Sequence, residues 1–579
     1  MNHRSVALVL SVAAAPGPQA VAQEVDLAVV HRIKAEAFEN GKVMDHLFFL
    51  TDVAGPRLTA SPGERAAADW AVSRLKGWGI ASARTEAWGR FGRGWQLKRY
   101  SGHLLTPSYA PLHGVPRAWS GETRGPVTAD VVFAPVFQAW EDEVRGDPAK
   151  AEARVREYVT RQRGKLRGKV VLIEPQVQSQ PATTPALTRY EEADLAKLQA
   201  APDPFPTPPL DWPVTRLPDD PKQRRELVAR LPLELSEDLW QRLGRAWEPL
   251  WSFLREEGVP AVLARDAWGR GAGGLVFAEE AGFWRAGSPV PPPVVVITPE
   301  SYGRLTRLVE RGHAVRVELD VDVELEEADR EAANVIAEIP GGSRADEVVM
   351  IGAHLDSWHG GTGATDNAAG CAVMLEAMRI LKALELKLDR TLRLALWTGE
   401  EQGIYGSRAY VKAHFADPST MALQPEHAKL AAYFNVDNGT GKVRGVYTQQ
   451  NAGAKPIFEA WLEPFGDLGA VAITQRNTGG TDHQSFDRVG LPGFQFIQDE
   501  ADYATRTHHT NVDVFDRLQR EDLMQASVIL ASFLYHAATR EGAFPRKPMP
   551  KDPPTPPPAE APANPAPPAG TSSARAAAR

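Results

Sequence analysis

Short apolar runs alternate with a helix-like pattern in the second half of the chain. The runs at residues 348–353, 391–397 and 430–436 are short and strongly apolar, which predicts strands. Between the first two runs, apolar residues recur at helical spacing, at Ala368, Cys371, Ala372, Leu375 and Met378. Strands that alternate with helices indicate an α/β domain in which helices cover a central sheet.

Side chains that bind metal ions stand mostly at the ends of these runs. The five candidate ligands are His354, Asp366, Glu401, Asp437 and His509. In open α/β sheets, ligands bind at the carboxyl ends of the strands, so we expect these side chains to meet there. Glu400 precedes Glu401, and adjacent glutamates can divide the work between holding a metal ion and taking a proton from water. The set is typical of a hydrolase with two metal ions.

Asp356 stands two residues after His354, where its carboxylate can accept the second imidazole N–H and fix the tautomer. Oxygen and nitrogen ligands without thiolate suit zinc in an open catalytic site, although manganese and cobalt fit the same donors. Taken alone, each short motif can also be explained by a structural role, such as a helix cap for Asp366 or a solvated face for Glu400 and Glu401. Their joint occurrence favours the metal site.

The motifs occur in the order His-x-Asp, Gly-Ala-x-Asp-Asn, Glu-Glu, Asn-x-Asp-Asn-Gly, Gly-x-Asp-His and His-Thr-x-x-Asp. This order resembles the co-catalytic zinc exopeptidases of family M28, including the carboxypeptidase Q branch. The resemblance implies a three-layer domain with a central mixed sheet, and two zinc ions per chain. It implies that one zinc ion binds His354 and Asp437, that the other binds Glu401 and His509, and that Asp366 bridges both.

The resemblance also makes Glu400 the general base and the Asp366–Asn367 peptide bond cis. It places Asp482 and His483 in a segment that lines the substrate side, where His483 is better explained as a hydrogen-bonded histidine. His508 precedes the last ligand and is a candidate for stabilising the oxyanion, although several relatives have tyrosine there.

The domain organisation follows from composition and resemblance. We expect a signal peptide at 1–22, a peptidase domain at 23–124 and 301–544, an insert at 125–300 with an extra loop at 181–250, and a disordered Pro/Ala-rich tail at 545–579. The insert contains β-rich pieces and resembles a protease-associated domain. A signal peptide implies a secreted or periplasmic protein.

The charge and hydropathy of the chain argue against some classes of binding partner. The net charge of −8 argues against nucleic acid or an anionic membrane. No stretch after the signal approaches the roughly 20 apolar residues of a membrane span. The single cysteine, Cys371, is expected to be a buried, inert thiol. A peptide substrate is the expected partner, and a homodimer stays open.

Two alternatives come from other classes of protein. A single-zinc acyltransferase similar to glutaminyl cyclase would not need both sets of ligands, and a receptor-like binding module would be expected to have lost some. The relatives that bind an acidic carboxyl-terminal residue use arginines after a Phe-x-Arg-x-Gly element. Here residues 486–490 are followed by Gly-Phe-Gln-Phe-Ile at 493–497, which disfavours such a substrate. Aminopeptidase and dipeptidase action both stay open.

Overall fold

The computed structural model describes residues 24–549, except 138–145, 177–184, 201–213, 215, 219–222, 224–226, 228–232, 266–272 and 286. The expected signal peptide at 1–22 therefore lies outside the described residues. So do residues 550–579 of the expected tail and much of the loop at 181–250. Every helix in the described part of the chain is too short or too polar to cross a bilayer.

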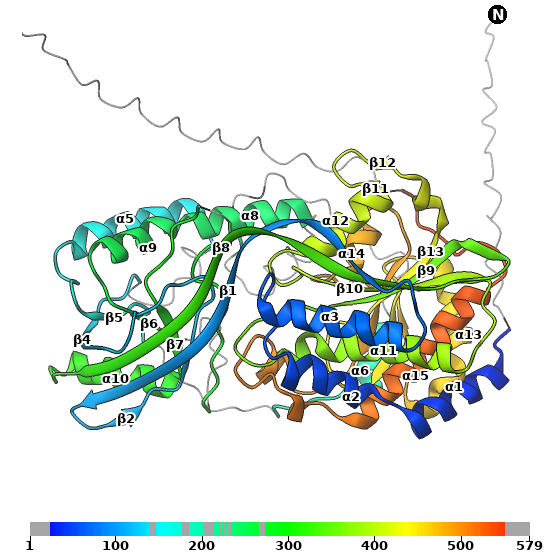
Figure 1. Cartoon of the computed structure of the whole chain (residues 1–579), viewed down its shortest axis with the longest axis horizontal. Helices are drawn as coiled ribbons and strands as arrows, with labels where there is room; N and C mark the ends of the chain where they lie inside the picture. Colours follow the sequence, from blue (N-terminus) through cyan, green and yellow to red (C-terminus); the bar gives the residue numbers. More distant parts are fainter. Residues whose placement is uncertain are drawn as a thin grey trace, which may run out of the picture.

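The described chain forms two lobes, and the larger one is built on a mixed sheet (Figure 1). Its strand order is β15-β14-β16-β13-β9-β10-β8, with β1 beside β8. The bounds are β15 (Ala472–Thr474), β14 (Val443–Tyr447), β16 (Gly493–Gln498), β13 (Leu430–Asn435), β9 (Arg344–His354), β10 (Arg390–Trp397), β8 (Arg316–Ile339) and β1 (Arg84–Thr106). Strands β16, β13, β9 and β10 are parallel neighbours, so their carboxyl ends share one edge. The three strands predicted from apolar runs are β9, β10 and β13.

Helices cover both faces of this sheet, which confirms the three-layer expectation. Along β9, Val349 and Ile351 join one core and Val348 and Met350 join another, because successive strand residues point to opposite faces. The first face is covered by α1 (Leu27–Asn40), α2 (Val43–Phe48), α3 (Pro62–Gly77), α11 (Ala369–Ala383), α13 (Lys455–Leu462) and α15 (Arg520–Thr539). The second is covered by α12 (Tyr405–His414) and α14 (His483–Asp487). Burial of Cys371 on α11 raises the pKa of its thiol to about 12, so it is unreactive.

The smaller lobe contains the four strands predicted for the insert, as β4 (Val127–Phe133), β5 (Val170–Leu172), β6 (Val262–Ala264) and β7 (Val294–Ile297). They are parallel, and β3 (Gly114–Pro116) pairs antiparallel with β7. Helices α5 (Pro148–Gln162) and α9 (Glu248–Glu256) pack on one face and α10 (Pro299–Glu310) on the other. The expectation of a β-rich unit missed these helices, whose apolar residues recur at helical spacing, as in Ala151, Val155 and Tyr158. Its identity as a protease-associated domain stays a prediction.

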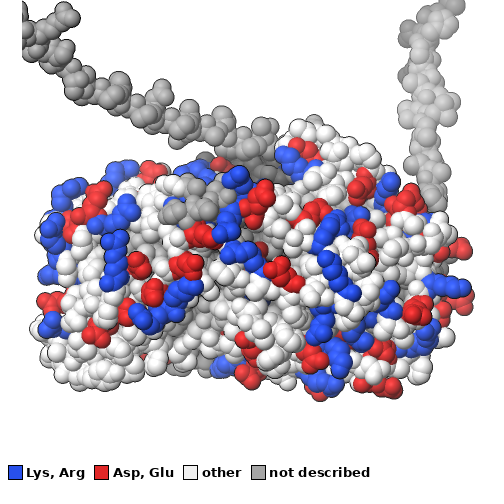
Figure 2. Space-filling model, viewed as in Figure 1, with Lys and Arg blue, Asp and Glu red and all other residues white. Residues whose placement is uncertain are grey.

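One long ribbon joins the lobes. Strands β1 and β8 pair antiparallel from Arg84 beside Ile336 to Thr106 beside Arg316, and the pair runs through both lobes in Figure 1. The smaller lobe therefore contains parts of β1 and β8 that lie outside residues 125–300. Figure 2 shows basic and acidic side chains interspersed over the face that it draws, without a continuous basic stripe.

Candidate metal centre

The candidate ligands come from loops at one edge of the large sheet. His354 ends β9, Glu401 lies in the turn after β10, and Asp437 follows β13. Because β13, β9 and β10 are adjacent and parallel, their carboxyl ends deliver these three side chains to the same place. His509, from the loop before α15, and Asp366, before α11, complete the group.

The backbone around Asp366 is fixed from both sides. The backbone amides of Thr365 and Asp366 donate to the carboxylate of Asp513, at 2.6 and 3.2 Å, and the side-chain amide of Asn367 donates to the carbonyl of Val436. The Asp366–Asn367 peptide bond is cis, as the family resemblance implied. Gly363 has a positive φ, and a Cβ there would collide with Ser357, so glycine is required at this turn.

The two carboxylate oxygens of Asp366 face different partners. Its Oδ1 lies 3.2 Å from Nε2 of His354, which lies 3.4 Å from Oδ1 of Asp437. Its Oδ2 lies 3.2 Å from Nε2 of His509, which lies 3.0 Å from Oε2 of Glu401. One aspartate therefore joins two groups of oxygen and nitrogen donors.

The electrostatics of the site fit bound cations. Burial and the Asp366 carboxylate raise the pKa of Glu401 to about 8. Burial, with Asp437 and Asp482 nearby, also raises the pKa of Glu400 well above its usual range, although His354 opposes this. Among the described residues, no hydrogen bond is made to the buried Oδ2 of Asp366 or to the buried Oε1 of Glu401. Divalent cations would satisfy these oxygens and offset the crowding of carboxylates, so the donor set fits zinc.

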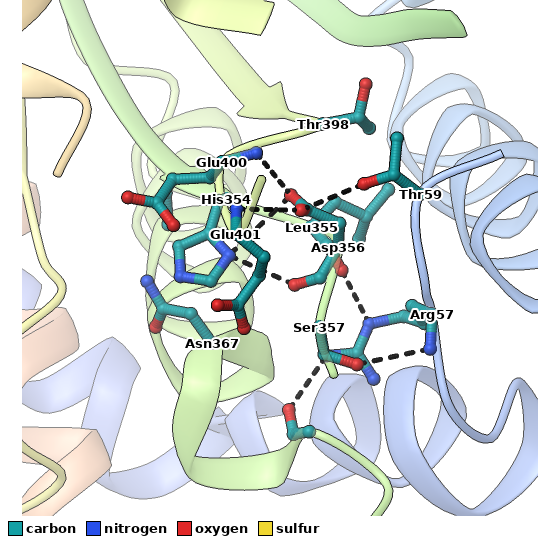
Figure 3. Close-up of polar contacts among 12 residues, drawn as sticks. Arg57, Thr59, His354, Leu355, Asp356, Ser357, Asn367, Thr398, Glu400 and Glu401 are labelled. Atoms are coloured by element: carbon teal, nitrogen blue, oxygen red, sulfur yellow. Dashed lines mark hydrogen bonds and ion pairs between the residues drawn. The ribbon is translucent and has the colours of Figure 1, made fainter. Parts of the chain in front are cut away.

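Asp356 organises the turn that carries both glutamates (Figure 3). Its carboxylate accepts hydrogen bonds from the backbone amides of Glu400 and Glu401, each at 3.2 Å, and from the hydroxyl of Thr59 at 3.1 Å. Nδ1 of His354 donates to the backbone carbonyl of Asp356 at 3.0 Å, whereas the carboxylate lies 3.7 Å away. The His354 tautomer is thus set by a carbonyl, and Nε2 faces Asp366.

His509 is held by a residue of the smaller lobe. Its Nδ1 lies 2.7 Å from Oε1 of Glu279, a geometry that orients the imidazole and increases its basicity. Two hydrogen bonds also join the loop of His509 to the loop of Glu279. The backbone amide of Asn511 donates to the carbonyl of Val276, and the backbone amide of Val276 donates to the side-chain oxygen of Asn511. Sequence reasoning missed Glu279, because it stands far from the metal motifs along the chain and no local motif marks it.

The remaining candidates lie around this centre in different roles. His508 stacks on the ring of His509, with centroids 3.7 Å apart, and its Nε2 lies 3.8 Å from Asp366. Asp482 is buried, and burial raises its pKa to about 7. His483 is also buried, with Nε2 2.9 Å from the amide of Gln449 and 3.0 Å from the carbonyl of Thr478, so it does not face the ligands.

A cavity of about 1150 Å³ lies over the centre and is lined by both lobes. Asp366, Glu400, Glu401, Asp437 and His508 form its floor on the large-lobe side. The smaller lobe contributes an aromatic wall, made of Trp240, Trp247, Trp251, Phe283 and Trp284. The space is large enough for a short peptide, with apolar surface beside the candidate metal centre.

Comparisons with known proteins agree with this arrangement. Residues 334–534 match the model of peptidase family M28. Carboxypeptidase Q of Bos taurus is 32% identical over 256 residues, which are 44% of this chain and 51% of that protein. Aminopeptidase YwaD of Bacillus subtilis is 28% identical over 34% of this chain and 42% of that protein. The chain thus spans about half the length of the curated relatives that it matches.

Among solved structures, a peptidase M28 precursor from Shewanella amazonensis shares the fold, with a TM-score of 0.59 and 22% identity. That match covers 90% of this chain and 98% of the other, so it includes both lobes. The family expected from the order of the motifs is confirmed: residues 334–534 form a domain of peptidase family M28.

Proposed function

We propose that this protein is a secreted or periplasmic two-zinc exopeptidase that hydrolyses peptide bonds near the amino terminus of short peptides or dipeptides. The observation that carries the proposal is the position of Asp366, whose two oxygens each lie 3.2 Å from a different histidine. Support for peptide substrates comes from the family match and from relatives named carboxypeptidase Q and aminopeptidase.

In this proposal His354 and Asp437 would hold one zinc ion, Glu401 and His509 would hold the other, and Asp366 would contribute to both. When bound, zinc supplies positive charge that polarises the scissile carbonyl and makes a water molecule more acidic. His354 and His509 would bind the ions through Nε2, because their Nδ1 atoms are engaged by the Asp356 carbonyl and by Glu279.

Glu400 is the proposed general base. It lies in the cavity with its backbone fixed by Asp356, and its carboxylate is grouped with His354 and Asp437. It takes the proton of the attacking water and later gives it to the leaving amine. Bound zinc would favour the ionised form of Glu400, which a general base requires.

The donor set favours this proposal over the two alternatives. A single-zinc acyltransferase would need only one of the two histidine and carboxylate groups, and a binding module would need neither. Both groups are complete here, on either side of Asp366. Homodimer formation stays a prediction.

The test is the Glu400→Gln variant, because glutamine keeps the size of the side chain but cannot take a proton. We expect unchanged zinc content and a turnover lower by about 10²- to 10⁴-fold on apolar dipeptides. Glu459→Gln on the exposed side of α13 is the matched control and should behave as wild type. Unchanged turnover of the Glu400 variant would contradict its role, and less than one zinc ion bound per chain after loading would contradict the metal centre.

A further inference from the structure

A second cavity, of about 500 Å³, is lined by residues of α2, α3 and α11 on the helical face of the large lobe, and we call it the helical pocket. Most of its lining is charged, and four of the side chains are basic: Lys42, Arg74, Arg379 and Lys382. The acidic side chains in the lining are Asp45 and Glu385. Because the whole chain has a net charge of −8, this excess of basic residues is local. The helical pocket shares no lining residue with the cavity over the candidate metal centre.

Two of the basic side chains have binding capacity that the described part of the chain does not use. Nε of Arg74 is buried and has no hydrogen-bond partner among the described residues. The Arg74 guanidinium lies over the rings of Phe49 and Trp70, 5.6 and 5.7 Å from their centroids, which restricts its position. Lys382 is exposed, and no described carboxylate forms an ion pair with it. An anion in the pocket could therefore bind both charges without breaking an existing pair.

A buried histidine adds a polar contact of a different kind. His46 is 1% exposed, and its Nε2 lies 3.1 Å from Oε2 of Glu376. Its Nδ1 is buried and has no hydrogen-bond partner in the described part of the chain. Burial lowers the pKa of His46, and hydrogen bonds from His46 and Arg379 outweigh burial to lower the pKa of Glu376 to about 2. The neutral ring thus donates through Nε2 to an ionised glutamate and offers an acceptor at Nδ1.

We propose that the helical pocket binds a phosphate group. The negatively charged oxygens match Arg74 and Lys382, and one of them would accept from the buried Nε of Arg74. Inorganic phosphate keeps an O–H at neutral pH, and a small phosphorylated molecule can carry a hydroxyl. Either group can donate to Nδ1 of His46. Sulfate has the same shape and charge but lacks this donor, so the histidine favours phosphate.

The helices of the pocket lead directly to the loops of the candidate metal centre. α11 begins shortly after Asp366, and α3 begins shortly after Thr59, whose hydroxyl donates to Asp356. A ligand that binds the folded state stabilises it by mass action. Phosphate bound across the three helices would therefore stabilise the part of the fold that carries these loops. The inference goes beyond the proposed function and does not depend on it.

The experiment titrates inorganic phosphate, glycerol 3-phosphate and sulfate into the zinc-loaded full chain at neutral pH, with binding measured by calorimetry. Arg74→Ala and Lys382→Ala should each weaken phosphate binding by about 10- to 100-fold, because each removes a charged contact. Sulfate should bind about fivefold more weakly than phosphate to wild type, because it cannot donate to His46. Lys76→Ala, at an exposed lysine of α3 outside the pocket, is the matched control and should keep the wild-type affinity.

Zinc can also bind phosphate, so Asp366→Ala is titrated beside wild type and should retain the binding. Binding that is lost in Asp366→Ala but unchanged in Arg74→Ala and Lys382→Ala would place phosphate at the metal centre and overturn the proposal. No saturable binding of either phosphate compound to wild type would also overturn it. Because Lys382 is exposed, Lys382→Ala decides if Arg74→Ala does not fold.

The three anions also identify the chemistry and the source of the ligand. Sulfate that binds wild type as tightly as phosphate would contradict the contact with His46 and the choice of phosphate. Glycerol 3-phosphate that binds more tightly than phosphate, with the loss in Lys382→Ala, would support the proposal and identify a small phosphorylated molecule as the ligand. Tighter binding of inorganic phosphate, with the same loss, would support the proposal and identify the free ion.

Discussion

The two lobes contribute to the same site in different ways. The large lobe supplies all five candidate ligands and Glu400, from loops at the edge of one sheet. The smaller lobe supplies no proposed ligand, but Glu279 holds His509, and Arg117 and an aromatic wall face the cavity. The candidate ligands therefore belong to one lobe, whereas the orientation of His509 and the lining of the cavity depend on both.

The contrast also explains which features are visible in the sequence. Ligands at strand ends follow recognisable apolar runs, because the same few residues form the strand and present the side chain. Glu279 meets His509 across 230 positions in the chain. Such a contact depends on how the lobes pack, and no local pattern records it. The candidate metal centre of the large lobe can thus be predicted from sequence motifs, whereas the contacts that the smaller lobe makes with it depend on the fold.

The largest expected effect comes from removing the shared ligand of the large lobe. Asp366→Ala should lower zinc content to below one ion per chain and activity by about 10³-fold or more, because both groups of donors lose a carboxylate oxygen. Asp467→Ala, at an exposed aspartate, serves as control. Two zinc ions retained by the Asp366 variant, measured by elemental analysis, would mean that the groups do not share this residue.

The contribution of the smaller lobe is tested at Glu279. Glu279→Ala should weaken zinc binding at the His509 position by about 10- to 100-fold, as expected when the partner of a ligating histidine is lost. Glu279→Gln keeps an acceptor for Nδ1 and should lose less. Competition with a chelator measures the affinity without relying on activity. Wild-type zinc affinity in both variants would show that the smaller lobe does not contribute to zinc binding.

The ligand loops of the large lobe also depend on a buried arginine. The Arg57 guanidinium donates to the carbonyls of Leu50, Leu355, Thr362 and Gly363 at distances of 2.6 to 2.8 Å. Arg57→Ala would leave these buried acceptors unpaired, so we expect a loss of about 2–4 kcal/mol in the free energy of unfolding. Denaturant unfolding measures it, and a change below about 0.5 kcal/mol would show that the loops hold their shape without this residue.

The smallest expected effect lies away from the site, at His414 and Glu86, whose side chains lie 2.7 Å apart. Their hydrogen bond raises the pKa of His414 and lowers the pKa of Glu86. The histidine contribution to stability is complete below its unfolded pKa of about 6.5 and is lost as pH rises through the raised value. The glutamate contribution is complete above its unfolded pKa of about 4.3 and is lost as pH falls through the lowered value. Both contributions to stability are therefore present near pH 5 to 6.

His414→Gln should therefore destabilise the protein by up to about 1 kcal/mol at pH 5.5, and by less at pH 8.5. Denaturant unfolding at the two pH values measures the difference. A loss of stability that is larger at pH 8.5 than at pH 5.5 would contradict this account.

Much of the fold and the centre was predictable from particular residues. The apolar runs before His354, Glu400 and Asp437 identified β9, β10 and β13, and short apolar runs identified β4 to β7. Helices α5 and α10 were not predicted because charged residues stand between their apolar positions and weaken the helical pattern. The carbonyl that engages His354, in place of the Asp356 carboxylate, depends on loop geometry that residue types do not determine.

The most direct test of the account is a crystal structure of the zinc-loaded protein with anomalous diffraction measured at the zinc edge. The account predicts two anomalous peaks that share Asp366, one beside His354 and Asp437 and the other beside Glu401 and His509. A single peak, or two peaks that do not share Asp366, would contradict the two-metal centre.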